Sequence, residues 1–340
     1  MSAKIFRVGF PWFLLWLLTC MTSGGVVAAA DDFVAGAPAR GQQTAARSAD
    51  VGTRYVLAVG VCKFADTRIA PLKYCVADAK SLAEYFAKDG VTPQNIRLLL
   101  DEDATRERLL AELRRLAGEL APADSLFFFY SSHGAGDAAG RTYFITFDAV
   151  LDQLAESALP MQELKAEIEK IRCRNVVMMV DTCHSGGVKS LQRPDEKAFD
   201  QLVRSADKTT RIAILTSSRT HETSLESEQW RHGAFTYFML EGLAGASDDF
   251  PRDGEVSVTE LFDYVMVAVP RATERAQHPS GKFSYNWPGK KEEAVKVGRA
   301  NGGGQPYQGQ NLAPGADPGQ DRGAGSSGAT GGPGWRPVVE

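Results

Sequence analysis

The chain has 340 residues, 24% of them charged, with 38 Lys and Arg against 42 Asp and Glu. A formal net charge of −4 without a basic run argues against a nucleic-acid-binding role. Five cysteines are too few for a disulfide-stabilised scaffold, so the fold has to depend on an ordinary hydrophobic core.

The first 30 residues have the pattern of a secretory signal peptide. Lys4 and Arg7 precede an apolar stretch at 10–21, and three alanines follow at 28–30. The apolar stretch is too short to span a bilayer, which favours a cleaved signal peptide over a membrane anchor. A lipidation box around Cys20 is a weaker alternative. We therefore expect an exported protein, periplasmic or secreted, whose net charge becomes −6 when two basic residues and no acidic residue are removed.

Composition divides the rest of the chain into a folded domain and two flanking segments. Residues 31–52 are Ala-rich and polar, which predicts a flexible lead-in. Residues 298–340 hold 13 glycines and five prolines among 43 residues, too little apolar surface to pack, so we expect a disordered tail. The domain between them, at 53–290, contains no stretch suited to a membrane helix. Export would permit a disulfide such as Cys62–Cys75, although spacing alone does not establish it.

Apolar runs and amphipathic stretches alternate along the domain, which predicts one α/β unit. In chain order we expect strand Tyr55–Val61, helix Ala77–Asp89, strand Ile96–Leu100, helix Thr105–Leu120, strand Ser125–Tyr130, a short strand in Arg141–Phe147, helix Met161–Ile171, strands Asn175–Val180 and Arg211–Leu215, and helices Phe235–Leu243 and Thr259–Val269. Runs such as "LFFFY" and "VVMMV" are apolar at every position. Strands of this kind are covered on both faces, as in a mostly parallel sheet between helix layers.

Polar residues follow two of these apolar strands abruptly. His133 comes after "LFFFYSS", and Cys183 comes after "VVMMVDT". In open parallel sheets, chemistry gathers at the carboxyl ends of the strands, and neighbouring strands lie about 5 Å apart. If the two strands are neighbours, the imidazole can take the proton that a free thiol mostly keeps at neutral pH. The backbone N–H groups of Gly134 and Cys183 would then hold the oxyanion of a substrate carbonyl.

Each of these residues also has a plainer interpretation. A cysteine after a strand is commonly a buried structural residue, and His-Gly is common in turns. A zinc site at Cys183 and His184 lacks a second pair of ligands at zinc spacing, and Ser132 and Ser185 do not lie in Gly-x-Ser-x-Gly elbows. The occurrence of both His133 and Cys183 at strand ends favours the catalytic interpretation.

Two motifs resemble those of a known family. "YSSHGAG" and "VDTCHSGG" are similar to the catalytic histidine and cysteine motifs of the caspase-like cysteine peptidases, and most similar to the bacterial-type metacaspase branch. Further segments resemble the family in order: "LKYCVADAKSLAEYF", "TYFITFDA", "ILTSSRTHETSLE", "HGAFTYFMLEGLAG" and "DGEVSVTELFDYV". The resemblance covers about residues 53–285. It implies a caspase-like three-layer α/β/α sandwich around a mostly parallel sheet of about six strands, the last one antiparallel.

The resemblance also implies roles for single residues. It makes Cys183 the nucleophile and His133 the general acid/base, with Gly134 and Cys183 as the oxyanion-hole donors. It gives His184 no base role, and no third member is evident beside the Cys/His dyad. The implied activity is that of a cysteine endopeptidase that cuts after Arg or Lys through an acyl-enzyme. That chemistry requires no cofactor, and calcium stays open as an activator.

Two aspartates match acidic specificity-pocket positions of the metacaspase branch, namely Asp78 and Asp181. A partly desolvated carboxylate pair prefers a cationic side chain, and Arg can engage it with two parallel hydrogen bonds. The plainer alternative is that Asp78 caps its helix and Asp181 only ends a strand. For calcium, neither Asp148 nor the aspartates clustered in 248–253 give a decisive ligand set, so we assign none.

The segment at 188–211 contains several basic residues, namely Lys189, Arg193, Lys197, Arg204 and Lys208. It is either an exposed charged linker or, as in related enzymes, a site of self-cleavage. Two other functions stay open for the whole chain: a catalytically silent caspase-like module that binds partners, and another cysteine hydrolase on the same scaffold. The expected partners are protein or peptide substrates with Arg or Lys before the cleaved bond. Natural substrates and oligomeric state are left open.

Overall fold

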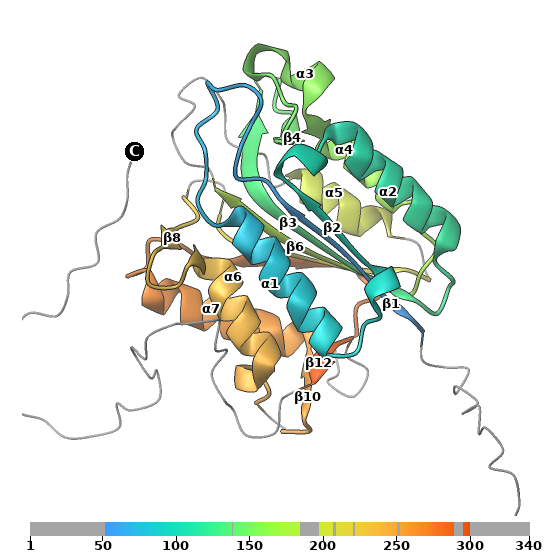
Figure 1. The fold of residues 1–340 in the computed structure, drawn as a ribbon. Helices are drawn as coiled ribbons and strands as arrows, with labels where there is room; N and C mark the ends of the chain where they lie inside the picture. The colour runs from blue at the N-terminus through green and yellow to red at the C-terminus, as the bar shows by residue number, and fades with distance from the viewer. Residues whose placement is uncertain are drawn as a thin grey trace, which may run out of the picture. The chain divides into compact units, whose positions relative to one another are not determined.

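The computed structural model describes residues 52–299 apart from 138, 184–196, 207–208, 220–221, 250–251 and 289–294. Its centre is a sheet whose main path has the strand order β11-β7-β6-β3-β1-β2 (Figure 1). These strands are β1 (Arg54–Gly60), β2 (Ile96–Leu100), β3 (Ser125–Gly136), β6 (Asn175–Cys183), β7 (Arg211–Thr216) and β11 (Ser280–Phe283). β11 runs antiparallel to β7, whereas the other neighbours in this path are parallel.

Helices cover both faces of this sheet (Figure 1). One layer contains α1 (Cys75–Lys88), α6 (Ala234–Glu241) and α7 (Val258–Ala272). The other layer contains α2 (Arg106–Glu119), α4 (Met161–Ile168) and α5 (Lys197–Ser205). The predicted α/β/α sandwich, with a mostly parallel sheet and an antiparallel last strand, is confirmed.

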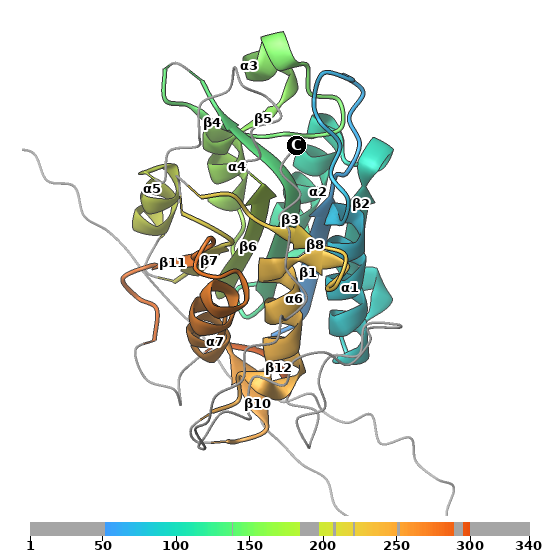
Figure 2. The ribbon, with the colours of Figure 1, turned by 90° about the vertical axis from the view of Figure 1, so that its left-hand side faces the viewer.

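Several short elements are attached to this framework. They are β4 (Thr142–Phe144), which pairs with β3 and β5 (Leu159–Pro160), α3 (Leu154–Ser157), and two small antiparallel pairs, β8 (Glu226–Ser227) with β9 (His232–Gly233) and β10 (Glu255–Ser257) with β12 (Lys296–Arg299). β9 packs against α1 and α6, and Figure 2 shows its partner β8 beside the same two helices.

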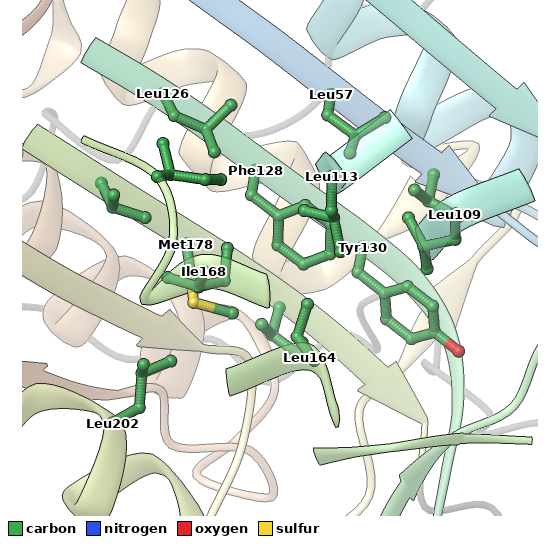
Figure 3. Packing of buried hydrophobic residues seen from close by; sticks show 14 of the residues in the cluster. Leu57, Leu109, Leu113, Leu126, Phe128, Tyr130, Leu164, Ile168, Met178 and Leu202 are labelled. Carbon is green, nitrogen blue, oxygen red and sulfur yellow. The ribbon is translucent and has the colours of Figure 1, made fainter. Parts of the chain in front are cut away.

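The side chains of β3 alternate between two hydrophobic cores. Those facing α2 and α4 are Leu126, Phe128 and Tyr130, and those facing α1 and α6 are Phe127 and Phe129. Figure 3 shows Phe128 packed in the same cluster as Leu113 of α2. Because successive side chains of a strand point to opposite faces and both faces are buried, every position has to be apolar. This is why the strand is an unbroken apolar run in the sequence.

Side-chain caps fix where two of the helices begin. The Thr105 hydroxyl accepts a hydrogen bond from the Arg108 N–H at the start of α2, at 3.3 Å. At the start of α7, Ser257 and Glu260 form a reciprocal capping box with N···O distances of 2.9 and 3.2 Å. Each cap satisfies N–H groups that have no partner inside the helix and stabilises it by about 1 kcal/mol.

Two strands are longer than predicted. They do not end at Tyr130 and Val180, since β3 continues to Gly136 and β6 continues to Cys183. A sheet ladder bonds the backbone N–H and C=O groups whatever the side chain is, so the change from apolar to polar residues did not mark the end of pairing. The candidate site residues therefore lie on strands and not, as expected, in the loops that follow them.

The folded domain also extends past its predicted end at 290. Gly298 and Arg299, the first two residues of the predicted tail, belong to β12, and the Arg299 N–H donates to Asp89 Oδ1 at 3.2 Å. A Cβ at position 298 would lie 1.8 Å from the Tyr85 hydroxyl, so only glycine fits there. The remainder of the tail and the predicted signal peptide at 1–30 lie outside the described residues. No helix in the described part of the chain is long and apolar enough to cross a bilayer.

Candidate active site

His133 and Cys183 lie side by side at the ends of two neighbouring strands. They are register partners in the parallel pair of β3 and β6. Adjacent strands lie about 5 Å apart, so the two backbones are as close as a sheet allows. The prediction that these strands are neighbours is therefore confirmed. For Cys183 the structure describes the backbone and not the side chain.

The His133 ring is held by two neighbours on the segment after β1. Its Nε2 lies 2.8 Å from the Ala70 carbonyl oxygen, and its ring stacks on Phe64 with a centroid distance of 5.3 Å and an interplanar angle of 27°. A carbonyl oxygen only accepts hydrogen bonds, so Nε2 carries the proton and donates it. Nδ1 is then the basic nitrogen of the neutral imidazole. The ring is thus fixed in both tautomer and orientation, and it is only 5% exposed.

The backbone of Gly134 points its N–H away from β4. The Ile145 N–H donates to the His133 carbonyl oxygen at 3.1 Å, and Gly134 is opposite Phe144 in the antiparallel ladder. Residues along such a ladder alternate, so Gly134 occupies a non-hydrogen-bonded position. Its N–H is accordingly directed to the side of β3 on which β6 lies, next to Cys183.

Asp78 and Asp181, which we call the carboxylate pair, meet on the face of the sheet that α1 and α6 cover. Asp78 lies in the first turn of α1, Asp181 lies on β6 two residues before Cys183, and the two are only 1% and 2% exposed. The period of two along β6 places Asp181 on the same face as Val177 and Met179. Both carboxylates are therefore buried beside the strand end that carries Cys183.

Three groups donate to Asp78. Its Oδ1 lies 2.7 Å from His232 Nδ1 and 3.3 Å from the Gly233 nitrogen, and its Oδ2 accepts from the Ser131 hydroxyl at 3.2 Å. These donors come from β9 and β3. The N-terminal cap position of α1 is Tyr74, so Asp78 is not the helix cap that the plainer interpretation made it.

Two hydroxyl groups hold Asp181. Ser224 donates to its Oδ1 and Thr236 of α6 donates to its Oδ2, both at 2.7 Å. Gly233 lies against the same carboxylate, because a Cβ there would be 2.7 Å from Asp181 Oδ2 and 3.6 Å from Asp78 Oδ2. Gly233 thus lies beside both aspartates and has no side chain that would displace them.

Burial makes this cluster electrostatically unfavourable while it is ionised. Desolvation raises the pKa of Asp78 to about 7, His232 opposes this by hydrogen bond and charge, and Asp181 adds to it by repulsion. Desolvation also raises the pKa of Asp181, although Ser224 and Thr236 counteract it. Glu226 of β8 is a third carboxylate whose pKa burial raises, and its charge repels the pair. A cation placed here would relieve this repulsion.

Comparisons with known proteins show which family the chain belongs to. A family model described as the caspase domain matches residues 53–285, which is more than half of the chain. The chain belongs to the caspase domain family. It is 34% identical over 163 residues to Metacaspase-1A of Aspergillus oryzae (42% of this chain, 37% of that protein) and 28% identical over 160 residues to Metacaspase-1 of Schizosaccharomyces pombe (41% and 36%). The matches thus span little more than a third of these relatives.

A solved structure is also similar in part. The crystal structure of protein GSU0716 from Geobacter sulfurreducens covers 68% of this chain and 93% of its own, with 20% sequence identity and a TM-score of 0.49.

Sequence reasoning missed several residues that surround the candidate site of this caspase domain. The Ala70 carbonyl gave no signal, since every residue has one. His232 and Glu226 lie on strands of two residues each, which have no detectable period. The segment "HGAFTYF" did contain a signal for His232, because a histidine and a glycine stand directly before an apolar helix.

The aspartates considered for calcium, Asp148 and those at 248–253, bind other groups of the protein where the structure describes them. Asp148 accepts from the Arg106 N–H and the Thr146 hydroxyl, and Asp248 accepts from two backbone N–H groups of its own loop. Within the described ranges, no three His, Cys, Asp or Glu side chains are grouped to hold a metal ion.

Cys62 and Cys75 are both buried, and they do not form the disulfide that export would permit. The Val76 N–H donates to the Cys62 sulfur at 3.3 Å, which places that thiol at the start of α1. His184 and, within the 188–211 segment, residues 188–196 and 207–208 lie outside the described residues.

Proposed function

We propose that this caspase domain is a metacaspase-like cysteine endopeptidase that cleaves peptide bonds after Arg or Lys. The observation that carries the proposal is the register of His133 with Cys183 beside two buried carboxylates. A catalytically silent module would have no use for an oriented imidazole, and a neutral substrate side chain would leave the repulsion between the buried carboxylates unrelieved.

The chemistry follows from the position of each group. Nδ1 of His133 takes the Cys183 thiol proton, and the thiolate adds to the substrate carbonyl. The developing oxyanion is stabilised by the N–H groups of Gly134 and Cys183, each worth about 3 kcal/mol in comparable sites. His133 then gives its proton to the leaving amine, which leaves a thioester. Water, deprotonated by His133, hydrolyses the thioester and regenerates the thiol.

Specificity would come from the carboxylate pair. Asp78 and Asp181 offer a guanidinium or ammonium group a partner that has already lost its water. An acidic side chain would be repelled by the same two charges, so cleavage after Asp is not expected.

A panel of fluorogenic peptide amides tests the proposal. We expect release of the fluorophore after Arg and Lys, none after Asp, and none in Cys183→Ala. Calcium would be included and omitted, because it stays a proposed activator only. Absence of Arg and Lys cleavage in both conditions would refute the proposal.

Export and self-processing complete the proposal. Export rests on the signal-peptide pattern of 1–30, and self-processing on the basic residues of 188–211. Lys197 and Arg204 lie in α5, and helical backbone does not fit a peptidase site, which makes Lys189, Arg193 and Lys208 the preferred positions. Incubation of wild type beside Cys183→Ala tests this: if both chains persist equally with and without calcium, self-cleavage is refuted.

A further inference from the structure

His232 makes an unusually buried contact with the carboxylate pair. It is 5% exposed, Asp78 is 1% exposed, and the imidazole Nδ1 lies 2.7 Å from Asp78 Oδ1. The two residues are 154 positions apart in sequence, so their contact depends on how β9 packs against α1. A buried ion pair contributes little to stability on average. The contact between His232 and Asp78 is therefore better explained by an effect on the proposed pocket.

Among the described residues, two other charged groups act on Asp78, and both work against its ionisation. Asp181 from β6 and Glu226 from β8 both repel a charge on Asp78, and burial removes the water that would stabilise it. Lys73 attracts the Glu226 carboxylate and so favours its charged form, which repels a charge on Asp78. The Ser131 hydroxyl and the Gly233 N–H donate to Asp78 but carry no charge. His232 is thus the titratable group that favours the ionised form.

We propose that His232 is a specificity-determining residue, whose imidazole aligns the Asp78 carboxylate and favours its ionised form, so that the pocket accepts a cationic side chain. The inference rests on the proposed function, because it takes the carboxylate pair as the site of the Arg or Lys side chain. His232 acts through Asp78 and is a positioning residue, not a catalytic one.

Binding of a cationic side chain should weaken as the pH falls and Asp78 is protonated. With His232 present, the pKa of Asp78 is about 7, so half of the Asp78 carboxyl groups are protonated at pH 7 and most of them at pH 5.5. Without His232, the burial and the repulsion act unopposed, and the pKa of Asp78 has to rise further. Binding of a cationic side chain should then require a more alkaline solution.

The experiment measures peptide binding to the full chain carrying Cys183→Ala, which blocks turnover. A short peptide ending in Arg is titrated by calorimetry between pH 5.5 and 9, beside the same peptide with citrulline, the neutral isostere of Arg. We expect the Arg peptide to bind at least about tenfold more weakly at pH 5.5 than at pH 9, because one unit of pKa corresponds to a factor of ten. The citrulline peptide should show no such dependence.

Substitution of His232 then separates the proposed role from a merely structural one. In His232→Leu we expect Arg-peptide binding at pH 7 to weaken at least about tenfold and to recover to within about threefold at pH 9. His232→Gln keeps a hydrogen-bond donor and should show a smaller shift. The control is His278→Leu, since His278 pairs with Glu222 at a similar 2.8 Å without contacting either aspartate; its pH profile should match the parent's.

Three outcomes would overturn the inference: no Arg-peptide binding at any pH, equal binding across the range, or an equal loss at all pH values in His232→Leu. If His232→Leu does not fold, histidine NMR of the Cys183→Ala chain replaces it. The His232 resonances should then shift with the Arg peptide and not with citrulline, and no shift would equally overturn the inference. Binding with the expected pH dependence, but without cleavage by wild type, would refute the proposed function alone.

Discussion

Gly233 lies in van der Waals contact with Asp181, so closely that a Cβ at 233 would be 2.7 Å from the carboxylate oxygen. The φ angle of Gly233 is −62°, which any residue can adopt, so glycine is required by space and not by backbone conformation. Position 233 thereby determines how near the chain comes to the carboxylate pair.

Gly233→Ala should therefore displace Asp181. We expect KM for Arg substrates to rise about tenfold or more, and unfolding free energy to fall by about 1–3 kcal/mol from overpacking. Gly118→Ala is the matched control, because a Cβ at this position of α2 meets nothing within 4 Å. Steady-state kinetics and urea unfolding of both variants check this; an unchanged KM in Gly233→Ala would contradict the placement of the pocket.

Removal of either member of the Cys/His dyad should abolish activity. We expect kcat/KM to fall by at least about 10³-fold in Cys183→Ala and in His133→Ala, and the double variant to be no worse, since the two groups act as a unit. Cys173→Ala provides the control. Burial raises the pKa of Cys173 to about 12, and its thiol donates to the Asn175 carbonyl oxygen, so it has no reactive thiolate. Loss of activity in this control would point to a different nucleophile.

The sequence predicted the sheet well because its central strands are buried on both faces. Burial on both sides forces an apolar residue at each position, and such runs are visible without any structure. β11 was not found from its own residues: "SGKF" is half-buried at every position, so it has no apolar run and no alternation. The resemblance to a family supplied that antiparallel strand instead.

The candidate site was predictable in part for a similar reason. His133 and Cys183 follow apolar runs, and Asp78 and Asp181 match family motifs. The residues that orient them did not stand out, because Ala70 acts through its backbone and His232 through a contact across 154 positions. Orientation depends on tertiary packing, which a residue type alone does not reveal.

Gln277 should affect both the stability of the fold and the binding of Arg substrates, because it holds a residue that contacts Asp181. It is fully buried, donates to the Ser217 carbonyl oxygen at 2.8 Å and to the Ser224 hydroxyl at 3.2 Å, and accepts from the Leu225 N–H at 2.8 Å. Ser224 in turn donates to Asp181. Gln277→Leu removes the partner of the Ser217 carbonyl oxygen and of the Leu225 N–H, at a cost of about 1–3 kcal/mol each, and removes the donor that holds the Ser224 hydroxyl.

For Gln277→Leu we therefore expect a lower melting temperature together with a higher KM for Arg substrates. Gln229→Leu, at an exposed position, should change neither quantity. Calorimetric melting and kinetics on the same preparations check the expectation. A destabilised variant with unchanged KM would show that Ser224 does not depend on Gln277.

Ionisation of Asp78 should lower the free energy of unfolding as the pH rises. Because burial raises the pKa of Asp78 to about 7 in the folded protein, the folded state binds more protons than the unfolded state between about pH 4 and pH 7. Stability therefore has to fall with rising pH across this window, by at most about 1.4 kcal/mol per pH unit. Asp78→Asn removes the titration while keeping the shape of the side chain.

We accordingly expect Asp78→Asn to unfold at a higher urea concentration than wild type at pH 8, with a stability gain of up to about 4 kcal/mol, and to differ little at about pH 4. The same variant should lose cleavage after Arg, since it halves the charge of the carboxylate pair. Asp148→Asn, which removes a carboxylate that accepts from the start of α2, should be destabilised at pH 8 instead. If Asp78→Asn were also less stable at pH 8, the buried carboxylate would be a structural requirement of the fold and not a charge retained for binding.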